Sequence, residues 1–234
     1  MGEQPFLSMV SLCHEHFTLI TPPSSQCSTH VAGIACGHRH GIASCGKLCS
    51  IKVLSSSSND EGSQGWASWL IAALEHVVND CTPKEGLAKT CVVSMALGGK
   101  YNQVLNDAVA AAVDQGVTVV VAAGNNNGPS SVIYDGDACH YSPSSEPKAI
   151  TVASITKDED ASAWDSNYGT CVDVYAPGVM ILSAWNGSPD AEGPMSGTST
   201  ASACECVALF APAWCTNPPE IIFSPFLVCP LANS

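Results

Sequence analysis

The sequence predicts an α/β protein whose sheet is doubly wound, mostly parallel and covered by helices on both faces. The middle of the 234-residue chain alternates short apolar runs with longer segments whose apolar residues recur at helical spacing. The clearest apolar run, VTVVVAA at residues 117–123, shows no polar alternation, which is typical of strands that are buried on both faces. Strands and helices that alternate in this way indicate a parallel sheet with helical connections.

The expected elements follow one another through this middle part. Ser68 is a candidate N-cap for a first helix, because its hydroxyl can accept from free backbone N–H groups. Asn102 opens a second helix, and Gly116 lies where the glycine that follows a helix end is expected. Strands are expected at residues 48–54, 91–97, 117–123, 149–154 and 172–175.

The two ends of the chain differ from the middle. Residues 1–26 show no clear period, and residues 212–234 hold five of the 15 prolines. Because proline breaks helices, the second of these segments is expected to be irregular. We therefore divide the chain into a divergent N-terminal segment 1–26, a main domain 27–211 and a tail 212–234. The first residues lack a basic segment before an apolar one, so no signal peptide is predicted.

The composition argues against two classes of partner. Asp and Glu number 21 against eight Lys and Arg, which gives a formal net charge of −13. Such an acidic chain repels phosphate backbones, so we expect no nucleic-acid partner. No apolar run reaches the ~18 residues of a membrane span, so we expect no membrane partner either. The 13 cysteines are many for a cytosolic enzyme, but their pairing cannot be read from the sequence.

Two short stretches carry side chains suited to acyl-transfer chemistry. Ser199 follows a tight turn and begins a helix, so its hydroxyl lies at a positive dipole end beside free N–H groups. That position suits a nucleophile whose attack creates an oxyanion. Asn125 follows the strand at 117–123, where a side-chain amide can donate to such an oxyanion. Taken alone, each has a simpler interpretation, an N-capping serine and an Asn-rich loop.

Six motifs occur in order over residues 28–201: STHVAG at 28–33, ALGG at 96–99, AAGN at 122–125, SNYG at 166–169, APG at 176–178 and GTSTA at 197–201. Together they resemble the motifs of the subtilisin-like serine peptidases, most closely the proteinase K-like branch. The resemblance implies a subtilisin-like fold that is incomplete at both ends. It also implies serine endopeptidase activity, with Ser199 as the nucleophile and Asn125 as the oxyanion-hole donor.

The resemblance further implies the surroundings of these two residues. An extended peptide or protein would be the substrate of an extracellular monomer, and the chemistry itself would require no cofactor. A structural calcium ion would be held by two carbonyls and one carboxylate, those of Pro147, Ala149 and Asp173. The substrate-binding positions would be Leu97, Gly98, Gly99, Ala122, Ala123 and Gly124, with Ser63, Gln64, Gly65 and Trp66 pairing with the peptide.

Two departures from the family's pattern bear on activity. The family's catalytic histidine begins H-G-T-H, and aligning its T-H with Thr29-His30 puts Cys27 in that place. His30 then matches the second, structural histidine. The family's catalytic aspartate precedes the histidine, yet no aspartate occurs before Asp60. The sequence therefore predicts that the general base and the acid that orients it are missing.

Three hypotheses for the function stay open. The chain is an active endopeptidase with a base that the sequence does not reveal, or a catalytically inactive pseudoenzyme that binds peptides. The third hypothesis is a truncated or mis-spliced peptidase fragment. We favour the family assignment of serine endopeptidase and expect this chain to be nearly inactive, since subtilisin loses about 10⁶ in turnover with its histidine alone.

Overall fold

A six-stranded, fully parallel sheet forms the centre of the protein, with the strand order β10-β9-β7-β5-β1-β2. Its strands are β1 (His16–Thr21), β2 (Lys47–Lys52), β5 (Cys91–Met95), β7 (Val117–Ala122), β9 (Ile150–Ile155) and β10 (Val174–Pro177). This computed structural model describes residues 16–21, 26–43, 47–56, 63–81, 91–128, 135–157 and 161–208. The parallel order confirms the predicted α/β class.

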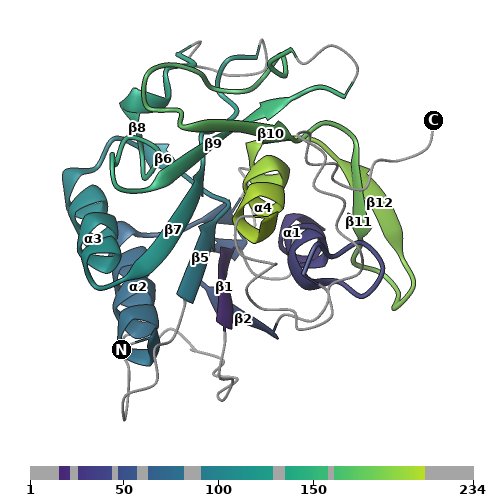
Figure 1. Ribbon diagram of the computed structural model, residues 1–234, viewed down its shortest axis with the longest axis horizontal. Coiled ribbons are helices and arrows are strands. Elements are labelled where there is room, and N and C mark those ends of the chain that lie inside the picture. The colour runs from purple at the N-terminus through teal and green to yellow at the C-terminus, as the bar shows by residue number, and fades with distance from the viewer. Residues whose placement is uncertain are drawn as a thin grey trace.

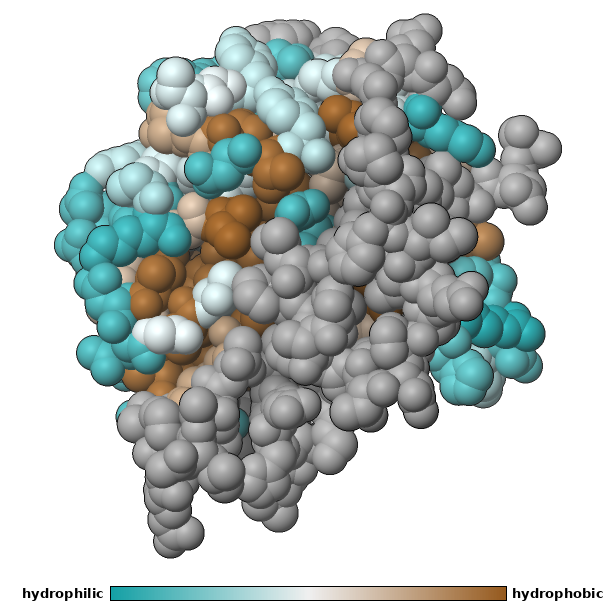
Figure 2. Space-filling view, viewed as in Figure 1, coloured by the Kyte–Doolittle hydropathy of each residue, from teal (hydrophilic) through white to brown (hydrophobic). Residues whose placement is uncertain are grey.

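Helices cover both faces of the sheet (Figure 1). Helices α2 (Ala67–Cys81) and α3 (Gln103–Asp114) pack on one face. Helices α1 (Gln26–Cys36) and α4 (Thr198–Ala208) pack on the other. In the same view, polar residues lie along the outer edge by α3, and apolar residues gather toward the middle (Figure 2).

The central strands are buried on both sides, which explains why they show no polar alternation. Val92 of β5 and Val120 of β7 belong to the core cluster that includes residues of α1 and α4. Their chain neighbours Val93 and Val121 belong to the cluster that includes residues of α2 and α3. Successive side chains of a strand point to opposite faces, so each face of a doubly covered strand needs apolar residues.

The shorter elements lie around this sheet. Among the described residues, two disulfides join Cys81 to Cys91 and Cys139 to Cys171. Within the same residues, no helix is both long enough and apolar enough to cross a membrane. The shorter elements are β3 (Ser55–Ser56), β4 (Ser63–Gln64), β6 (Gly99–Lys100), the 3-10 helix η1 (Ala138–His140), β8 (Tyr141–Ser142), β11 (Ile181–Ala184) and β12 (Glu192–Met195).

The predicted helix signals have different outcomes. Asn102 is the N-cap of α3, because its Oδ1 accepts from the Leu105 N–H at 3.1 Å. Gly116 follows the end of α3 with a φ of 88°, as expected for a glycine in that position. The prediction that Ser68 is the N-cap is wrong by two positions. Helix α2 already begins at Ala67, so Ser68 lies inside its first turn rather than at the cap.

The sequence did not predict strand β1. It lies between β5 and β2 in the sheet, within the first 26 residues, where no period is visible. Its sequence, HFTLIT, lacks the continuous apolar run seen at 117–123, and its pairing depends on strands far along the chain. The expected strand ends also shift by up to two residues; β2, for example, ends at Lys52 rather than at 54. The predicted irregular tail 212–234 lies outside the described residues.

Candidate active site

Ser199 lies in the first turn of α4, at the edge of the sheet where the strands end. The turn before it is fixed by Gly197, whose φ is 144° and whose N–H donates to the Gly178 carbonyl at 2.8 Å. The Ser199 hydroxyl donates to the carbonyl of Ala96, just beyond β5, at 3.2 Å. The side chain is half-buried, so it is held at a surface opening and remains accessible.

Asn125 connects the end of β7 with the beginning of α4. Its Oδ1 accepts from the backbone N–H of Thr198 at 2.9 Å and from the Thr198 hydroxyl at 3.0 Å. Because a backbone N–H can only donate, these bonds fix the oxygen of the amide against the helix and direct Nδ2 away from it. A Cβ placed on Gly197 would lie 3.0 Å from that Nδ2. An amide donor therefore faces the turn that presents Ser199.

The loop that carries Asn125 is held by Asn167, which belongs to the SNYG motif. The Asn167 amide donates to the Ala123 carbonyl at 2.9 Å, and its Oδ1 accepts from the Asn126 N–H at 2.7 Å. Gly124 has a φ of 103°, and a Cβ there would lie 2.5 Å from Asn167 Nδ2. The glycine and the buried asparagine thus position Asn125. Asn167 was not predicted as a site residue, although its motif was recognised.

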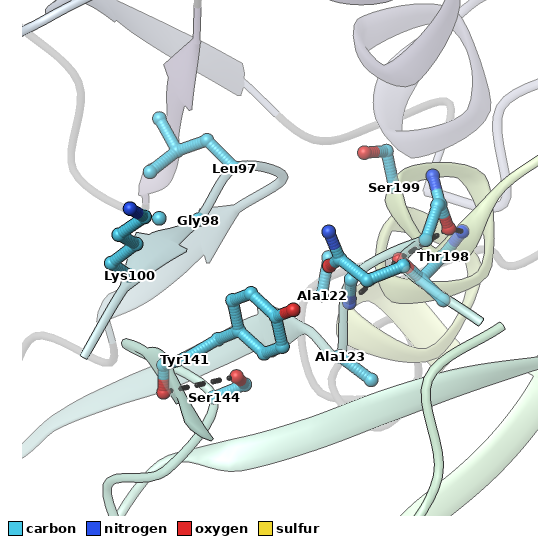
Figure 3. A pocket seen from close by; sticks show the side chains of 13 residues that line it. Leu97, Gly98, Lys100, Ala122, Ala123, Tyr141, Ser144, Thr198 and Ser199 are labelled. Carbon is cyan, nitrogen blue, oxygen red and sulfur yellow. Dashed lines mark hydrogen bonds between the residues drawn. The ribbon is translucent and has the colours of Figure 1, made fainter. Parts of the chain in front are cut away.

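A pocket with a cavity volume of about 420 Å³ connects these residues (Figure 3). Five further lining residues were not predicted: Lys100, Asn126, Tyr141, Ser144 and Thr198, of which only Thr198 lies within a recognised motif, GTSTA. The predicted residues that line it are Leu97, Gly98, Gly99, Ala122, Ala123, Gly124, Asn125 and Ser199. The structure therefore brings together residues from the ends of β5 and β7 with the start of α4.

Cys27 contacts the nucleophile position from the first turn of α1. Its half-buried thiol forms a hydrogen bond with the Ser199 side chain. Burial raises the pKa of the Cys27 thiol, and the hydrogen bond to Ser199 opposes that rise only in part. The thiol is therefore protonated at neutral pH and is a poor acceptor for the Ser199 proton.

His30 does not take part in this site. It is fully buried between α1 and the β11–β12 hairpin, where its Nε2 lies 2.8 Å from the Ile181 carbonyl and 3.1 Å from the Gly193 carbonyl. Burial lowers the pKa of His30 against the opposing effect of these two carbonyls. A neutral, buried histidine bonded to backbone confirms the structural role expected for it.

Four predicted substrate-binding residues do not line this pocket. Ser63 and Gln64 form β4, which pairs with the antiparallel strand β3. Gly65 and Trp66 follow as exposed residues, and 71% of Trp66 is accessible to solvent. None of the four is among the described residues that line the pocket. Their predicted contact with an extended peptide stays a prediction.

Of the three predicted calcium ligands, Pro147 and Ala149 precede β9 in the chain, and Asp173 is bonded to the second residue of that strand. The Oδ2 atom of Asp173 accepts from the Thr151 N–H at 2.8 Å, which fixes the carboxylate beside the strand. Pro147 and Asp173 are exposed, whereas Ala149 is buried. Two carbonyls and a carboxylate are oxygen donors of the kind that a hard cation prefers, so the residues fit calcium chemically.

A serine at a helix N-terminus beside an amide donor, at the end of a parallel sheet, defines a serine-hydrolase class of site. Comparison with known proteins is more specific. A model described as the subtilase family matches residues 23–211, and the chain belongs to this family. It is therefore a member of a family of serine proteases.

Individual relatives agree with this assignment. Alkaline protease 1 of Aspergillus flavus is 41% identical over 174 residues, which cover 74% of this chain and 39% of that protein. Subtilisin-like protease 2 of Pseudogymnoascus destructans is 42% identical over 174 residues, with the same coverage of 74% and 39%. The chain thus spans about two fifths of the length of these curated relatives. The crystal structure of a cold adapted subtilisin-like serine proteinase matches with a TM-score of 0.69 and 29% identity, covering 87% of this chain and 77% of that one.

Proposed function

We propose that this chain acts as a peptide-binding domain of the subtilisin type, with little or no hydrolytic activity. The observation that carries the proposal is the pair of side chains beside Ser199, those of Asn125 and Cys27. Asn125 and Ser199 line one pocket, while a protonated thiol, that of Cys27, occupies the position that a general base would need. The pocket and the amide donor support binding of a peptide carbonyl group, and the thiol opposes its hydrolysis.

The magnitude of the loss supports binding over catalysis. In subtilisin, which gives the family its name, loss of the catalytic histidine alone costs about 10⁶ in turnover. The oxyanion hole and substrate binding retain only about 10³–10⁴ over the reaction in water. None of the described residues that line the pocket carries an imidazole or a carboxylate. A chain of this kind is expected to bind peptides far better than it cleaves them.

The test compares the purified chain with its Ser199→Ala variant on one labelled extended peptide. Fluorescence anisotropy should report binding by both proteins, because Ser199 supplies only one hydroxyl to the pocket. Mass spectrometry of the same samples should show no cleavage above the variant's background. Ser188→Ala, in the exposed β11–β12 hairpin, is the matched control.

Two other outcomes would overturn the proposal. Cleavage that disappears in Ser199→Ala and persists in Ser188→Ala would show an active endopeptidase with a base that the described residues do not supply. Absence of binding by the folded protein would show that the pocket does not accept extended peptides.

We also propose an extracellular location. The disulfides Cys81–Cys91 and Cys139–Cys171 support it, because such bonds persist in oxidising compartments and are rare in the cytosol. Reaction of the native protein with a thiol reagent before and after reduction tests this: the four cysteines should become reactive only after reduction. Their reactivity in the protein as secreted or extracted would contradict the proposal.

A calcium ion held by Pro147, Ala149 and Asp173 is likewise proposed as a stabilising group. Calcium at 100 times its Kd is expected to add about 2.7 kcal/mol to the free energy of unfolding, which raises Tm by about 5–10 °C. Asp173→Asn should abolish this rise, because the negative charge that binds calcium is lost. The amide oxygen can still accept from the Thr151 N–H, so the local fold is preserved. Thermal unfolding in calcium, magnesium and a chelator measures the effect. An equal rise in wild type and variant would contradict the site.

A further inference from the structure

The pocket beside Ser199 is apolar over much of its surface and contains a single charge. Its described lining residues include one lysine, Lys100, and no aspartate or glutamate. The chain as a whole carries 21 acidic residues against eight basic ones, so a lone cation in this position is unlike the molecule around it. Lys100 therefore makes the pocket locally positive, although the chain as a whole is acidic.

Lys100 is fixed at the pocket wall by backbone pairing. It ends β6, and its register partner across the antiparallel pair with β8 is Tyr141. Figure 3 shows Lys100 and Leu97 on one side of the pocket and Ser199 and Thr198 on the other, with the Tyr141 ring between them. An occupant of the pocket thus meets the lysine side chain opposite the nucleophile position.

The Lys100 ammonium is available to a ligand. Among the described ion pairs, Lys148 is held by Asp114 at 2.6 Å and Arg39 by Glu192 at 2.6 Å, whereas no described carboxylate pairs with Lys100. The acidic group that acts on Tyr141 is Asp135, whose carboxylate is bonded to His140 at 2.6 Å. The Tyr141 hydroxyl donates to the Asp135 carbonyl at 2.8 Å and so does not compete for the lysine.

We propose that Lys100 makes this pocket select a peptide side chain that ends in a carboxylate, with glutamate as the preferred residue. The inference rests on the proposed peptide-binding function. The two methylenes of glutamate lie against apolar walls such as Leu97 and Ala122, and the carboxylate pairs with the ammonium of Lys100. Without Lys100 the same walls favour an uncharged side chain.

The expected preference for glutamate comes from direct contact with Lys100, because the net negative charge of the chain repels an acidic peptide. At physiological ionic strength the Debye length is about 8 Å, so the remaining acidic surface is largely screened while a contact pair is not. An exposed or partly exposed ion pair of this kind is worth about a two- to fivefold change in Kd. A matched peptide with glutamine, which has the same shape and no charge, isolates that contribution.

The experiment uses three labelled peptides with an alanine background and one variable residue, glutamate, glutamine or leucine. Fluorescence anisotropy at 150 mM salt gives Kd for the wild-type chain, Lys100→Met and Lys100→Glu. Wild type should bind the glutamate peptide about two- to fivefold more tightly than the glutamine peptide. Lys100→Met should bind the two equally, and Lys100→Glu should reverse the order. Lys157→Met, an exposed lysine outside the pocket, is the matched control and should keep the preference.

The remaining outcomes overturn the inference in distinguishable ways. Equal Kd values for glutamate and glutamine in wild type, or a preference that survives in Lys100→Met, would show that Lys100 does not select the side chain, even though peptide binding stands. Failure of the folded chain to bind any of the three peptides would overturn the proposed function and this inference with it. Circular dichroism of each variant confirms that it is folded.

Discussion

Replacing Cys27 with histidine is expected to raise Ser199-dependent peptide hydrolysis by about 10²-fold. Cys27 already forms a hydrogen bond with the Ser199 side chain, so an imidazole built from the same position starts within reach of the nucleophile. In subtilisin, loss of the aspartate costs about 10⁴ in turnover and loss of the histidine about 10⁶. A chain with the histidine but without the aspartate should therefore stand about 10² above one that lacks both.

The pH profile and two further variants identify the source of any gain. Neutral imidazole is the base, so turnover of Cys27→His should rise with pH through about 6.5, the ordinary pKa of histidine. Cys27→Asn, which has no titrating group, should stay at background. The double variant Cys27→His with Ser199→Ala should return to background as well. A gain that survives in the double variant, or no gain at all in a folded Cys27→His, would show that position 27 is not placed for general-base catalysis.

The fold was largely predictable because its central strands carry their own signal. Apolar residues follow one another without a polar residue between them at Val92-Val93 in β5 and at Val120-Val121 in β7. Burial on both faces of a strand requires that pattern. Strand β1 was not predictable from the same kind of reasoning. Its position between β5 and β2 is fixed by pairing with residues some 30 and 75 positions along the chain, as His16 pairs with Lys47 and Cys91. Such long-range pairing leaves no local period.

The site was predictable where a motif sets the backbone and not where side chains from separate strands meet. Asn125 and Ser199 lie in turns whose glycines take positive φ values, and those glycines are visible in the sequence. Lys100 and Tyr141 share the pocket only because β6 pairs with β8, which no local pattern indicates. The contact of Cys27 with Ser199 likewise depends on how α1 and α4 pack. Alignment to the family puts Cys27 at the position of the catalytic histidine, and the hydrogen bond of Cys27 to Ser199 comes from the structure.

Asn125 carries two roles that substitution can separate. Its Oδ1 accepts from the Thr198 N–H and hydroxyl at the start of α4, which is a capping role, while its Nδ2 is the donor facing the Ser199 turn. Asn125→Ala removes both. Loss of a helix cap costs about 1 kcal/mol of stability, and loss of an oxyanion donor costs about 10²–10³ in turnover, the latter measured in subtilisin.

Asn125→Asp removes only the donor. A carboxylate still accepts from Thr198, and its charge is favourable at a helix N-terminus by about 0.3–1 kcal/mol, so the free energy of unfolding should be unchanged or slightly higher. In the Cys27→His background the same variant should lose at least as much turnover as Asn125→Ala, because it places a negative charge where the oxyanion forms. Urea unfolding and turnover of both variants test the separation. If Asn125→Asp retained the turnover of its parent, the amide would have no part in stabilising an oxyanion, and its bonds to Thr198 would be its whole role.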